Sequence, residues 1–490
     1  MGAVEVGSGA AAVAAGARHT WIANPLAGTV TAIDPASMRV AETVPVGGIP
    51  RSLSVNGDTV WAAVDGEVRA QAPRARGIDP MPASICEPVV GGSKSADLLI
   101  VSDLPLQGGI RVAATQMAQA INFALRERGF RAGRFRVAYQ SCDDSVARTG
   151  LFDEAKCAAN ARAYARNPAV GAVIGTLNSP CALAAVPELN RARGGPLAMV
   201  SPLNSFVGLT RQAPGVPPEL LASLYPTGRR NYLRVFPTDD LQGAALALLA
   251  RDRGKRRVYV LDDGDPIYGE LMATGFTTAA RRLGLQVVGG ASWDPGARSY
   301  EALARRVAVA RPDAVFFGGL LDTNAADVVR AVRRAAPEAD VLAPDGLTPL
   351  TFFARAAGPA AQGAFVSFSG VVTERLPRAG AEFVSRFART QAGAAIEPSA
   401  VYAAQAAQVV LRAISRSDGT RAGILDQLFD TRVRGGLLGS FSFDERGDIT
   451  ESPVTILRVD RGAGDRALES VEGGVVERVM RPSPSLVAPD

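Results

Sequence analysis

Histidine is almost absent from this chain, in which His19 is the only one. A single histidine near the N-terminus excludes a Ser-His-Asp triad in the rest of the chain and disfavours histidine-based zinc sites. Cysteine is also scarce, and none of Cys86, Cys142, Cys157 and Cys181 forms a Cys-x-x-Cys pair. The spacing therefore indicates no metal site. The even number fits either two disulfides in an oxidising compartment or four free buried thiols.

Long apolar runs and nucleotide-binding motifs are missing as well. The sequence has no run of about 18 apolar residues, which excludes a membrane-spanning helix. No P-loop or Gly-x-Gly-x-x-Gly lies where a nucleotide would need it, and we expect no cofactor. The 53 Lys and Arg residues exceed the 48 Asp and Glu residues by only 5 in a chain of 490 residues, and the excess is scattered. Composition thus argues against nucleic acid as a partner.

The N-terminus does not read as a targeting signal. Its first 16 residues, MGAVEVGSGAAAVAAG, lack a basic segment and are apolar only through Ala, Gly and Val. If the protein works outside the cytoplasm, as we expect, its export signal lies upstream of this chain. The length of 490 residues predicts two or three domains.

Residues 1–85 contain an internal repeat. Val6-Gly7 recurs as Val46-Gly47, and Trp21-Ile22-Ala23 recurs as Trp61-Ala62-Ala63, both 40 residues later. Such a period with short strands is typical of a β-propeller blade. The stretch at residues 21–47 also resembles the repeats of YVTN and NHL-type propellers; its sequence is WIANPLAGTVTAIDPASMRVAETVPVG. We therefore expect about two blades, the end of a truncated propeller; a small independent β domain is the alternative.

From residue 95 to about 462, strand patterns alternate with helix patterns. Strands are predicted at residues 98–102, 135–139, 170–175, 197–201, 257–261, 286–290, 314–318, 341–343 and 364–367. A helix is predicted over Ala113–Arg128, where apolar residues recur at helical spacing, and similar patterns separate the other strands. The fold class is therefore α/β, with parallel sheets covered on both faces. About 365 residues exceed the size of one sheet and predict two lobes.

The stretch from Val173 to Ser205 organises this section. Two apolar runs each end in a small polar loop, and the first loop opens a helix with Ser179 as N-cap and Pro180 at the first helical position. Helix N-termini hold carboxylates or phosphates, and ligands in open α/β sheets lie beyond the carboxyl ends of strands. The stretch is thus a candidate binding site. Alternatively, Ser179 and Ser201 only cap and turn the chain.

A series of short motifs then carries a family resemblance. In order these are AYQSCDD (138–144), VIGTLNSPCA (173–182), MVSPLNS (199–205), DDLQG (239–243), YG (268–269), VFFGGLLD (315–322) and LAPDG (342–346). Taken together, the section resembles the type I periplasmic binding proteins, specifically the receptors for leucine, isoleucine, valine and related amino acids.

The resemblance implies two Rossmann-like lobes joined by three crossovers, near 236–240, 367–372 and 436–441. It places the first lobe at 95–236 and 371–436 and the second lobe at 237–370 and 437–462. We expect a linker at 86–94, within a stretch rich in Pro, Arg and Gly, and a surface tail at 463–490.

The resemblance also implies ligand contacts. In the family, the α-carboxylate is held by a serine at a helix start and by the loop after the next strand, which match Ser179 (beside Asn178) and Asn204 with Ser205. The α-ammonium is held by an acid that matches Asp345, although the family more often has Glu. Alternatively, Asp345 is only a turn residue before glycine. Tyr268 matches an aromatic that closes over the ligand; packing at a helix start is the alternative.

Two further positions bear on the ligand. An aromatic that helps to hold the ammonium in the family is Leu320 here, so a cation–π or hydroxyl contact is lost and a standard amino acid is in doubt. Asp103, at the end of the first strand, could supply another polar group, or it is only a loop residue. The resemblance also pairs Cys142 with Cys181, which leaves Cys86 with Cys157.

The function implied is that of a non-enzymatic solute-binding protein. A small polar ligand, an amino acid or related carboxylate, binds between the lobes, and an ABC permease is the expected partner. The attached propeller suggests an alternative, the extracellular ligand-sensing module of a larger membrane signalling protein. A hydrolase or transferase is disfavoured by the single histidine. We interpret Arg229, Arg230 and Arg234 as a solvated or lobe-crossing segment rather than as a phosphate site.

Overall fold

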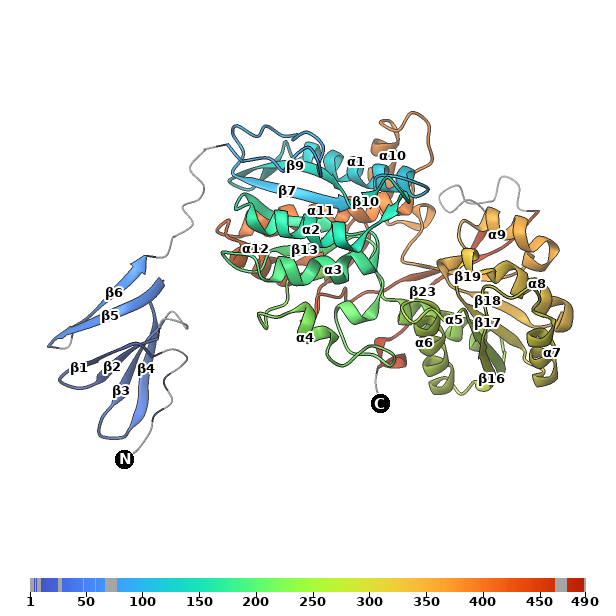
Figure 1. Cartoon of the computed structure of the whole chain (residues 1–490), viewed down its shortest axis with the longest axis horizontal. Coiled ribbons are helices and arrows are strands. Elements are labelled where there is room, and N and C mark those ends of the chain that lie inside the picture. The colour runs from blue at the N-terminus through green and yellow to red at the C-terminus, as the bar shows by residue number, and fades with distance from the viewer. Residues whose placement is uncertain are drawn as a thin grey trace. The chain divides into compact units, whose positions relative to one another are not determined.

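The computed structural model describes residues 4, 6, 10–24, 29–46, 48–57, 59–66, 77–462 and 474–488. The chain divides into two compact units, Met1–Arg74 and Ala75–Asp490 (Figure 1). Among the described residues, no helix has the length and apolar character needed to cross a bilayer.

The first unit consists of a four-stranded antiparallel sheet and a hairpin. The sheet has the order β1-β2-β3-β4, with β1 at Ala12–Ala15, β2 at Thr20–Asn24, β3 at Thr29–Asp34 and β4 at Arg39–Pro45. The hairpin joins β5 (Gly48–Asn56) to β6 (Thr59–Gly66). Trp21 pairs with Ala14, and 40 residues later Trp61 pairs with Ser54. The repeat seen in the sequence is therefore also a repeat of strand register.

The second unit begins with a six-stranded sheet, which forms the first lobe. Its order is β14-β13-β12-β7-β9-β8, and only β8 runs antiparallel to its neighbour. The strands are β7 (Leu98–Leu104), β8 (Arg131–Ala132), β9 (Phe135–Asp143), β12 (Val170–Gly175), β13 (Ala198–Ser201) and β14 (Tyr232–Arg234). A small hairpin, β10 (Ser145–Val146) and β11 (Leu151–Phe152), follows β9.

Helices cover both faces of this sheet because its strands are apolar on both sides. Leu98 and Ile100 of β7 pack into one hydrophobic cluster, whereas Leu99 and Val101 pack into another. The first cluster contains α1 (Arg111–Glu127), α10 (Arg378–Ala388), α11 (Pro398–Arg416) and α12 (Arg421–Phe429); the second contains α2 (Glu154–Arg166), α3 (Ser179–Asn190) and α4 (Leu220–Leu224).

The second lobe has a seven-stranded sheet with the order β16-β15-β17-β18-β19-β22-β23. The strands are β15 (Arg257–Asp262), β16 (Gln286–Ser292), β17 (Ala314–Gly318), β18 (Asp340–Ala343), β19 (Phe365–Ser369), β22 (Val454–Arg458) and β23 (Val475–Met480). One face carries α5 (Asp239–Asp252) and α6 (Gly269–Arg282), and the other carries α7 (Glu301–Ala310), α8 (Ala325–Ala335) and α9 (Leu350–Ala357). The predicted α/β fold class with two lobes is confirmed.

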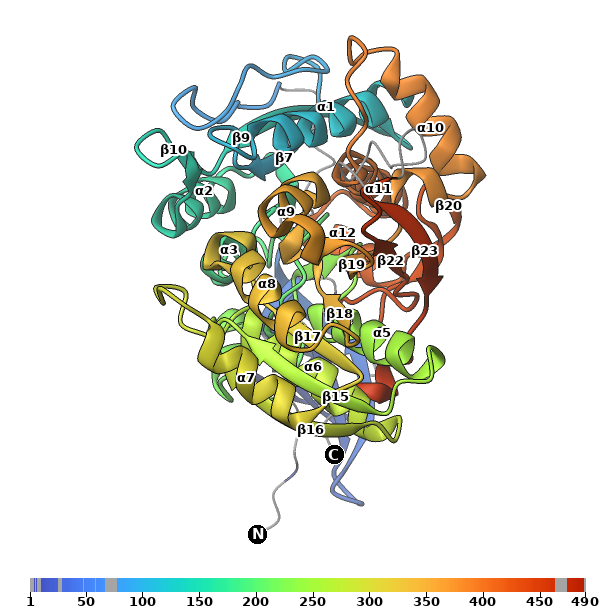
Figure 2. The ribbon, with the colours of Figure 1, turned by 90° about the vertical axis from the view of Figure 1, so that its right-hand side faces the viewer.

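Three segments cross between the lobes. The first follows β14, the second follows β19, and the third leads from the hairpin β20 (Arg432–Gly436) and β21 (Gly439–Ser442) to β22. Figure 2 shows β22 between β19 and β23. The hairpin belongs to the first lobe, because Val433 and Phe441 pack in its core. β23 lies within the stretch expected to be a tail: it pairs antiparallel with β22 and supplies an edge strand.

The segment 77–94 packs on the first lobe along the edge of β9. Ile78 and Met81 are buried in its core. The Gln140 side chain accepts a hydrogen bond from the Met81 N–H (2.7 Å) and donates one to the Glu87 carbonyl (2.9 Å). Part of the stretch that composition marks as a linker is therefore integral to the lobe.

The disulfides join Cys86 to Cys142 and Cys157 to Cys181. The pairing implied by the family resemblance, Cys142 with Cys181 and Cys86 with Cys157, is therefore wrong. The segment 77–94 runs antiparallel to β9, which sets Cys86 opposite Cys142. Helix α2 packs on α3, which brings Cys157 to Cys181.

Candidate functional site

The candidate site is built from loops at the carboxyl ends of parallel strands in both lobes. In the first lobe, Asn178 and Ser179 follow β12, and Asn204 and Ser205 follow β13. In the second lobe, the loops after β15, β17 and β18 carry Tyr268, Leu320 and Asp345. Loop backbones at this edge have unpaired polar groups, which is why such edges bind ligands.

Asn204 ties the two first-lobe loops together. Its side-chain N–H groups donate to the carbonyls of Thr176 (3.1 Å) and Leu177 (2.9 Å), and its Oδ1 accepts from the Tyr232 hydroxyl (3.0 Å). The Ser201 hydroxyl donates to the same Thr176 carbonyl (3.0 Å). Asn204 is fully buried, so its side chain positions the loops.

Gly175 allows these loops to approach β7. Its φ is +152°, and a Cβ at this position would lie 2.5 Å from the Asp103 carbonyl oxygen. Any other residue would push β12 away from β7 just before the loop that starts α3.

The N-terminus of α3 is a candidate anion site. Asn178 is the N-cap, but its side chain makes no capping hydrogen bond. The Ser179 hydroxyl accepts a hydrogen bond from the Phe206 N–H (3.3 Å), which joins the helix start to the loop after β13. Both residues are half-buried. The helix start therefore offers unpaired N–H groups and partial positive charge to an anion.

In the second lobe, Asp345 is held by two side chains. Its Oδ1 accepts from the Tyr268 hydroxyl (2.7 Å) and from the Gln242 side chain (3.2 Å). The Tyr268 hydroxyl in turn accepts from the Gly346 N–H (2.7 Å). Tyr268 thus fixes the loop that presents the carboxylate. Burial raises the pKa of Asp345, and the hydrogen bonds from Tyr268 and Gln242 oppose that rise.

Asp239 connects the two halves of the site. Its N–H donates to the Ser205 carbonyl (3.0 Å), and its carboxyl is close enough to Asp345 for the two charges to interact. Burial first, and then the Asp345 charge, raise the pKa of Asp239 to about 8. Ser179 therefore contacts the loop 204–206, this loop contacts Asp239, and Asp239 interacts with Asp345. A cation placed here would relieve the repulsion between the two carboxyl groups.

Leu320 and Asp103 have other surroundings. The Leu320 N–H donates to the Asp263 carboxylate (3.3 Å) and to the Thr323 hydroxyl (3.1 Å), and its side chain is half-buried. Asp103 is buried, and its Oδ1 accepts from Asn160 (3.0 Å) and Tyr164 (2.8 Å) of α2. No described hydrogen bond joins Asp103 to the group around Asp345.

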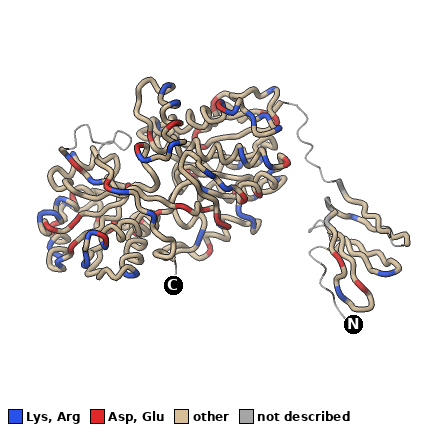
Figure 3. Tube along the Cα trace, turned by 180° about the vertical axis from the view of Figure 1, so that it is seen from behind, with Lys and Arg blue, Asp and Glu red and all other residues tan. Residues whose placement is uncertain are grey.

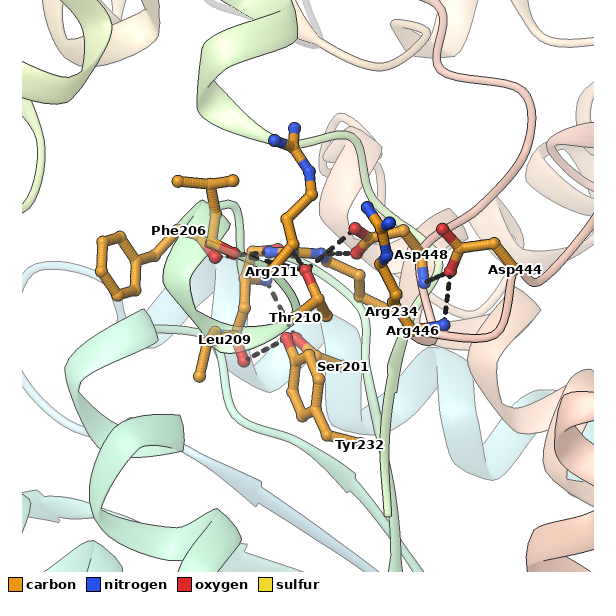
Figure 4. Close-up of polar contacts among 12 residues, drawn as sticks. Ser201, Phe206, Leu209, Thr210, Arg211, Tyr232, Arg234, Asp444, Arg446 and Asp448 are labelled. Atoms are coloured by element: carbon orange, nitrogen blue, oxygen red, sulfur yellow. Dashed lines mark hydrogen bonds and ion pairs between the residues drawn. The ribbon is translucent and has the colours of Figure 1, made fainter. Parts of the chain in front are cut away.

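Arg234 is a buried residue beside the site (Figure 4). It donates to the Asp448 carboxylate (2.7 Å), the Phe206 carbonyl (2.8 Å) and the Thr210 hydroxyl (2.5 Å). It therefore fastens the loop after β13 to the third crossover. Arg211 forms an ion pair with Asp240 of α5, which adds a contact between the lobes. Arg234 was not identified as a positioning residue from the sequence. Arg234 is buried and the nearby Arg230 is partly exposed, but no local pattern distinguishes the two arginines.

Asp239 and Gln242 were also missed as site residues. Both belong to the motif DDLQG, which carried part of the family resemblance, so a signal was present. A metal centre is not assigned to Asp144, Cys157 and Cys181, whose ligand atoms lie within 4.8 Å of one another, because the two sulfurs form a disulfide.

Two α/β lobes joined by three crossovers, with polar loops of both lobes meeting at one edge, define a two-lobe ligand-binding protein. The sequence matches the periplasmic binding protein family over residues 104–465, and the chain belongs to that family. It is accordingly a solute-binding protein of a family that works outside the cytoplasm.

Individual relatives agree with this assignment. The Leu/Ile/Val-binding protein BraC3 of Rhizobium johnstonii is 23% identical over 371 residues, which cover 75% of this chain and 93% of the relative. The crystal structure of the leucine-binding protein LivK of Thermotoga maritima has a TM-score of 0.61 and 23% identity, over 79% of this chain and 99% of that chain. A solute-binding protein of R. palustris in complex with benzoate has a TM-score of 0.57 and 17% identity, over 79% and 96%. The predicted periplasmic binding protein fold is thereby confirmed.

Proposed function

We propose that the protein binds a free α-amino acid between its lobes for ABC-type uptake. The observation that carries the proposal is the arrangement of charge across the site. On one side the open start of α3 and the Ser179 hydroxyl suit a carboxylate. On the other side Asp239 and Asp345, two buried carboxyl groups that repel each other, suit an ammonium group.

The charge arrangement separates two ligand classes found among the relatives. LivK of Thermotoga maritima is a leucine-binding protein, whereas the R. palustris protein binds benzoate. Benzoate has a carboxylate but no cation, so it would leave Asp239 and Asp345 without a partner. The acidic pair therefore favours an amino acid. Asn204, Tyr268 and Gln242 position the loops, and Leu320 can contact an apolar side chain.

Calorimetric titration of the full chain with leucine, isoleucine, valine and benzoate tests the proposal. We expect at least one amino acid to bind and benzoate to bind at least 10-fold more weakly, because the ammonium–carboxylate contact is worth about 2 kcal/mol or more. Asp345→Asn should weaken amino acid binding by about 30-fold or more. The matched control is Asp430→Asn, which changes an exposed Asp after α12. Equal affinity of the parent and Asp345→Asn would contradict the assignment.

We further propose that a membrane permease is the partner and that the N-terminal unit is derived from propeller blades. A four-stranded antiparallel meander with a 40-residue repeat of register supports the second point. Lys and Arg residues are interspersed with Asp and Glu residues along the backbone trace of the α/β unit (Figure 3). This distribution gives no support to nucleic acid as a partner.

A further inference from the structure

A cavity lies among the three crossovers, separate from the candidate site. Its volume is about 240 Å³, and every crossover lines it: Val235 and Pro237 from the first, Val371 and Pro377 from the second, Ile449 and Pro453 from the third. No residue of the candidate site is part of its lining. We call it the hinge cavity.

The two lobes also supply walls of the hinge cavity. Tyr402 of α11 and Phe441 of β21 belong to the first lobe, whereas Val479 belongs to β23 at the edge of the second-lobe sheet. Tyr402 is fixed, because its hydroxyl accepts from the Val371 N–H (2.7 Å). Any rotation of one lobe against the other must change the distance between Tyr402 and Val479. We therefore expect the shape of the cavity to differ between the open and closed states of the hinge.

The chemistry of the lining indicates an amphiphilic anion. Its inner walls are valine, leucine, isoleucine, proline and aromatic side chains, and three charged residues, Arg375, Arg481 and Glu451, complete it. All three are exposed, and none forms a described ion pair. Two guanidinium groups against one carboxylate leave a positive rim over an apolar interior, which is complementary to an acid with a short apolar tail.

We propose that the hinge cavity binds a small apolar monocarboxylate, and that its occupancy changes the affinity of the cleft for its ligand. The acid group pairs with Arg375 and Arg481, and the tail packs between Tyr402, Phe441 and Val479. Because the cavity differs between the open and closed states, a bound acid stabilises one of them. The coupling is reciprocal: the cleft ligand changes the affinity of the cavity for the acid by the same factor. The coupling between the hinge cavity and the cleft rests on the proposed function.

The probe for the first part is hexanoate, compared with its uncharged analogue hexanamide on the full chain. We expect hexanoate to bind and hexanamide to bind at least about five-fold more weakly, since pairing with rim charges is worth about 1 kcal/mol. Arg375→Gln/Arg481→Gln should weaken hexanoate about five-fold or more, with hexanamide unchanged. Glu451→Gln should leave hexanoate binding equal or tighter. No hexanoate binding, or equal binding of hexanoate by the parent and the double arginine variant, would overturn the proposal.

The cleft variant Asp345→Asn keeps this test separate from the proposed function. Hexanoate should bind Asp345→Asn as it binds the parent, whether or not an amino acid ligand is found. Loss of hexanoate binding in this variant would place the acid in the cleft and overturn the proposal.

Titration of the amino acid with and without saturating hexanoate then measures the coupling. We expect at least a two-fold change in its Kd, which the double arginine variant abolishes; an unchanged Kd would contradict the coupling alone.

Discussion

At the scale of single residues, two pairs of carboxyl groups differ in their surroundings. Asp239 and Asp345 lie at the proposed ligand site, where a cation could join them. Asp103 and Asp144 lie beneath α2, where Asp103 has two hydrogen-bond donors and Asp144 has none for either oxygen among the described residues. Asp144 is fully buried. Burial, and then the charges of Asp103 and Asp143, raise the pKa of Asp144 well above its ordinary value.

Asp144→Asn should therefore stabilise the protein, and more so at higher pH. The pKa of Asp144 is higher in the folded state than in the unfolded state, where it is about 4. Below about pH 4 the carboxyl is protonated in both states and its contribution to stability is fully present. As pH rises from about 4 toward the folded-state pKa, only the unfolded state loses the proton, so this contribution is lost. The amide cannot ionise, so the variant avoids that loss. We expect a gain of about 1–3 kcal/mol in the free energy of unfolding at pH 8 and a smaller gain at pH 5, measured by urea denaturation. An equal gain at both pH values would contradict the argument, and Asp430→Asn serves as the exposed control.

At the scale of elements, the disulfides and the loop contacts hold the site in place. Cys181 lies in the first turn of α3, the helix whose start lies at the proposed ligand site, and its bond to Cys157 fastens α3 to α2. Cys86–Cys142 fastens the segment 77–94 to β9 instead.

Peptide mapping of the non-reduced protein by mass spectrometry checks this pairing. We expect one peptide pair to contain Cys86 with Cys142 and the other to contain Cys157 with Cys181. Cys157→Ala/Cys181→Ala should lower the free energy of unfolding by about 2–4 kcal/mol, since the bond closes a loop with a sequence separation of 24. A Cys142–Cys181 peptide pair would disprove the assignment.

Asn204 and Asn178 provide a matched pair of variants in the neighbouring loops. Asn204→Ala removes hydrogen bonds to Thr176 and Leu177 and leaves the carbonyls of both residues with fewer donors, so we expect a loss of about 1–3 kcal/mol of stability. Asn178→Ala should cost less than about 0.5 kcal/mol, because that side chain makes no capping bond. Thermal unfolding of both variants measures the difference; equal losses would mean that Asn204 does not hold the loops together.

At the scale of the whole molecule, we expect the N-terminal unit to be separable from the α/β unit and the segment 77–94 not to be. Residues 1–74 form their own compact unit, whereas the segment after them is buried in the first lobe and carries Cys86. The full chain and its α/β unit should therefore bind ligand equally.

Two truncated chains test this division. A chain that begins at Ala75 should keep the parent's amino acid affinity within about two-fold and its unfolding midpoint for the α/β unit. A chain that begins at Ser95 loses a disulfide and the contacts of Gln140 with Met81, so we expect about 2–5 kcal/mol less stability. Loss of ligand binding in the first chain would show that the N-terminal unit takes part in the site.

The local pattern of the chain was enough to predict the two-lobe α/β class and the loop that carries Ser179, and the family resemblance added Asp345. The pattern depends on neighbours in sequence: a strand such as β7 begins with an apolar run, Leu98–Val101, and ends in polar residues. The position of a loop at the carboxyl end of a strand follows from that order alone.

The contacts that complete the site depend on segments far apart in the chain. Only the tertiary structure pairs Cys86 with Cys142, buries Arg234 against Asp448, adds β23 to the second sheet and sets Asp239 beside Asp345. In the same order, these partners lie 56, 214, about 20 and about 100 residues apart along the chain. The local periodicity of a sequence does not specify which distant segments pack against each other. Sequence alone therefore determined the alternation of strands and helices and the edge proposed to bind a ligand. Packing determined which charges meet there, because burial and proximity set both their pKa values and their partners.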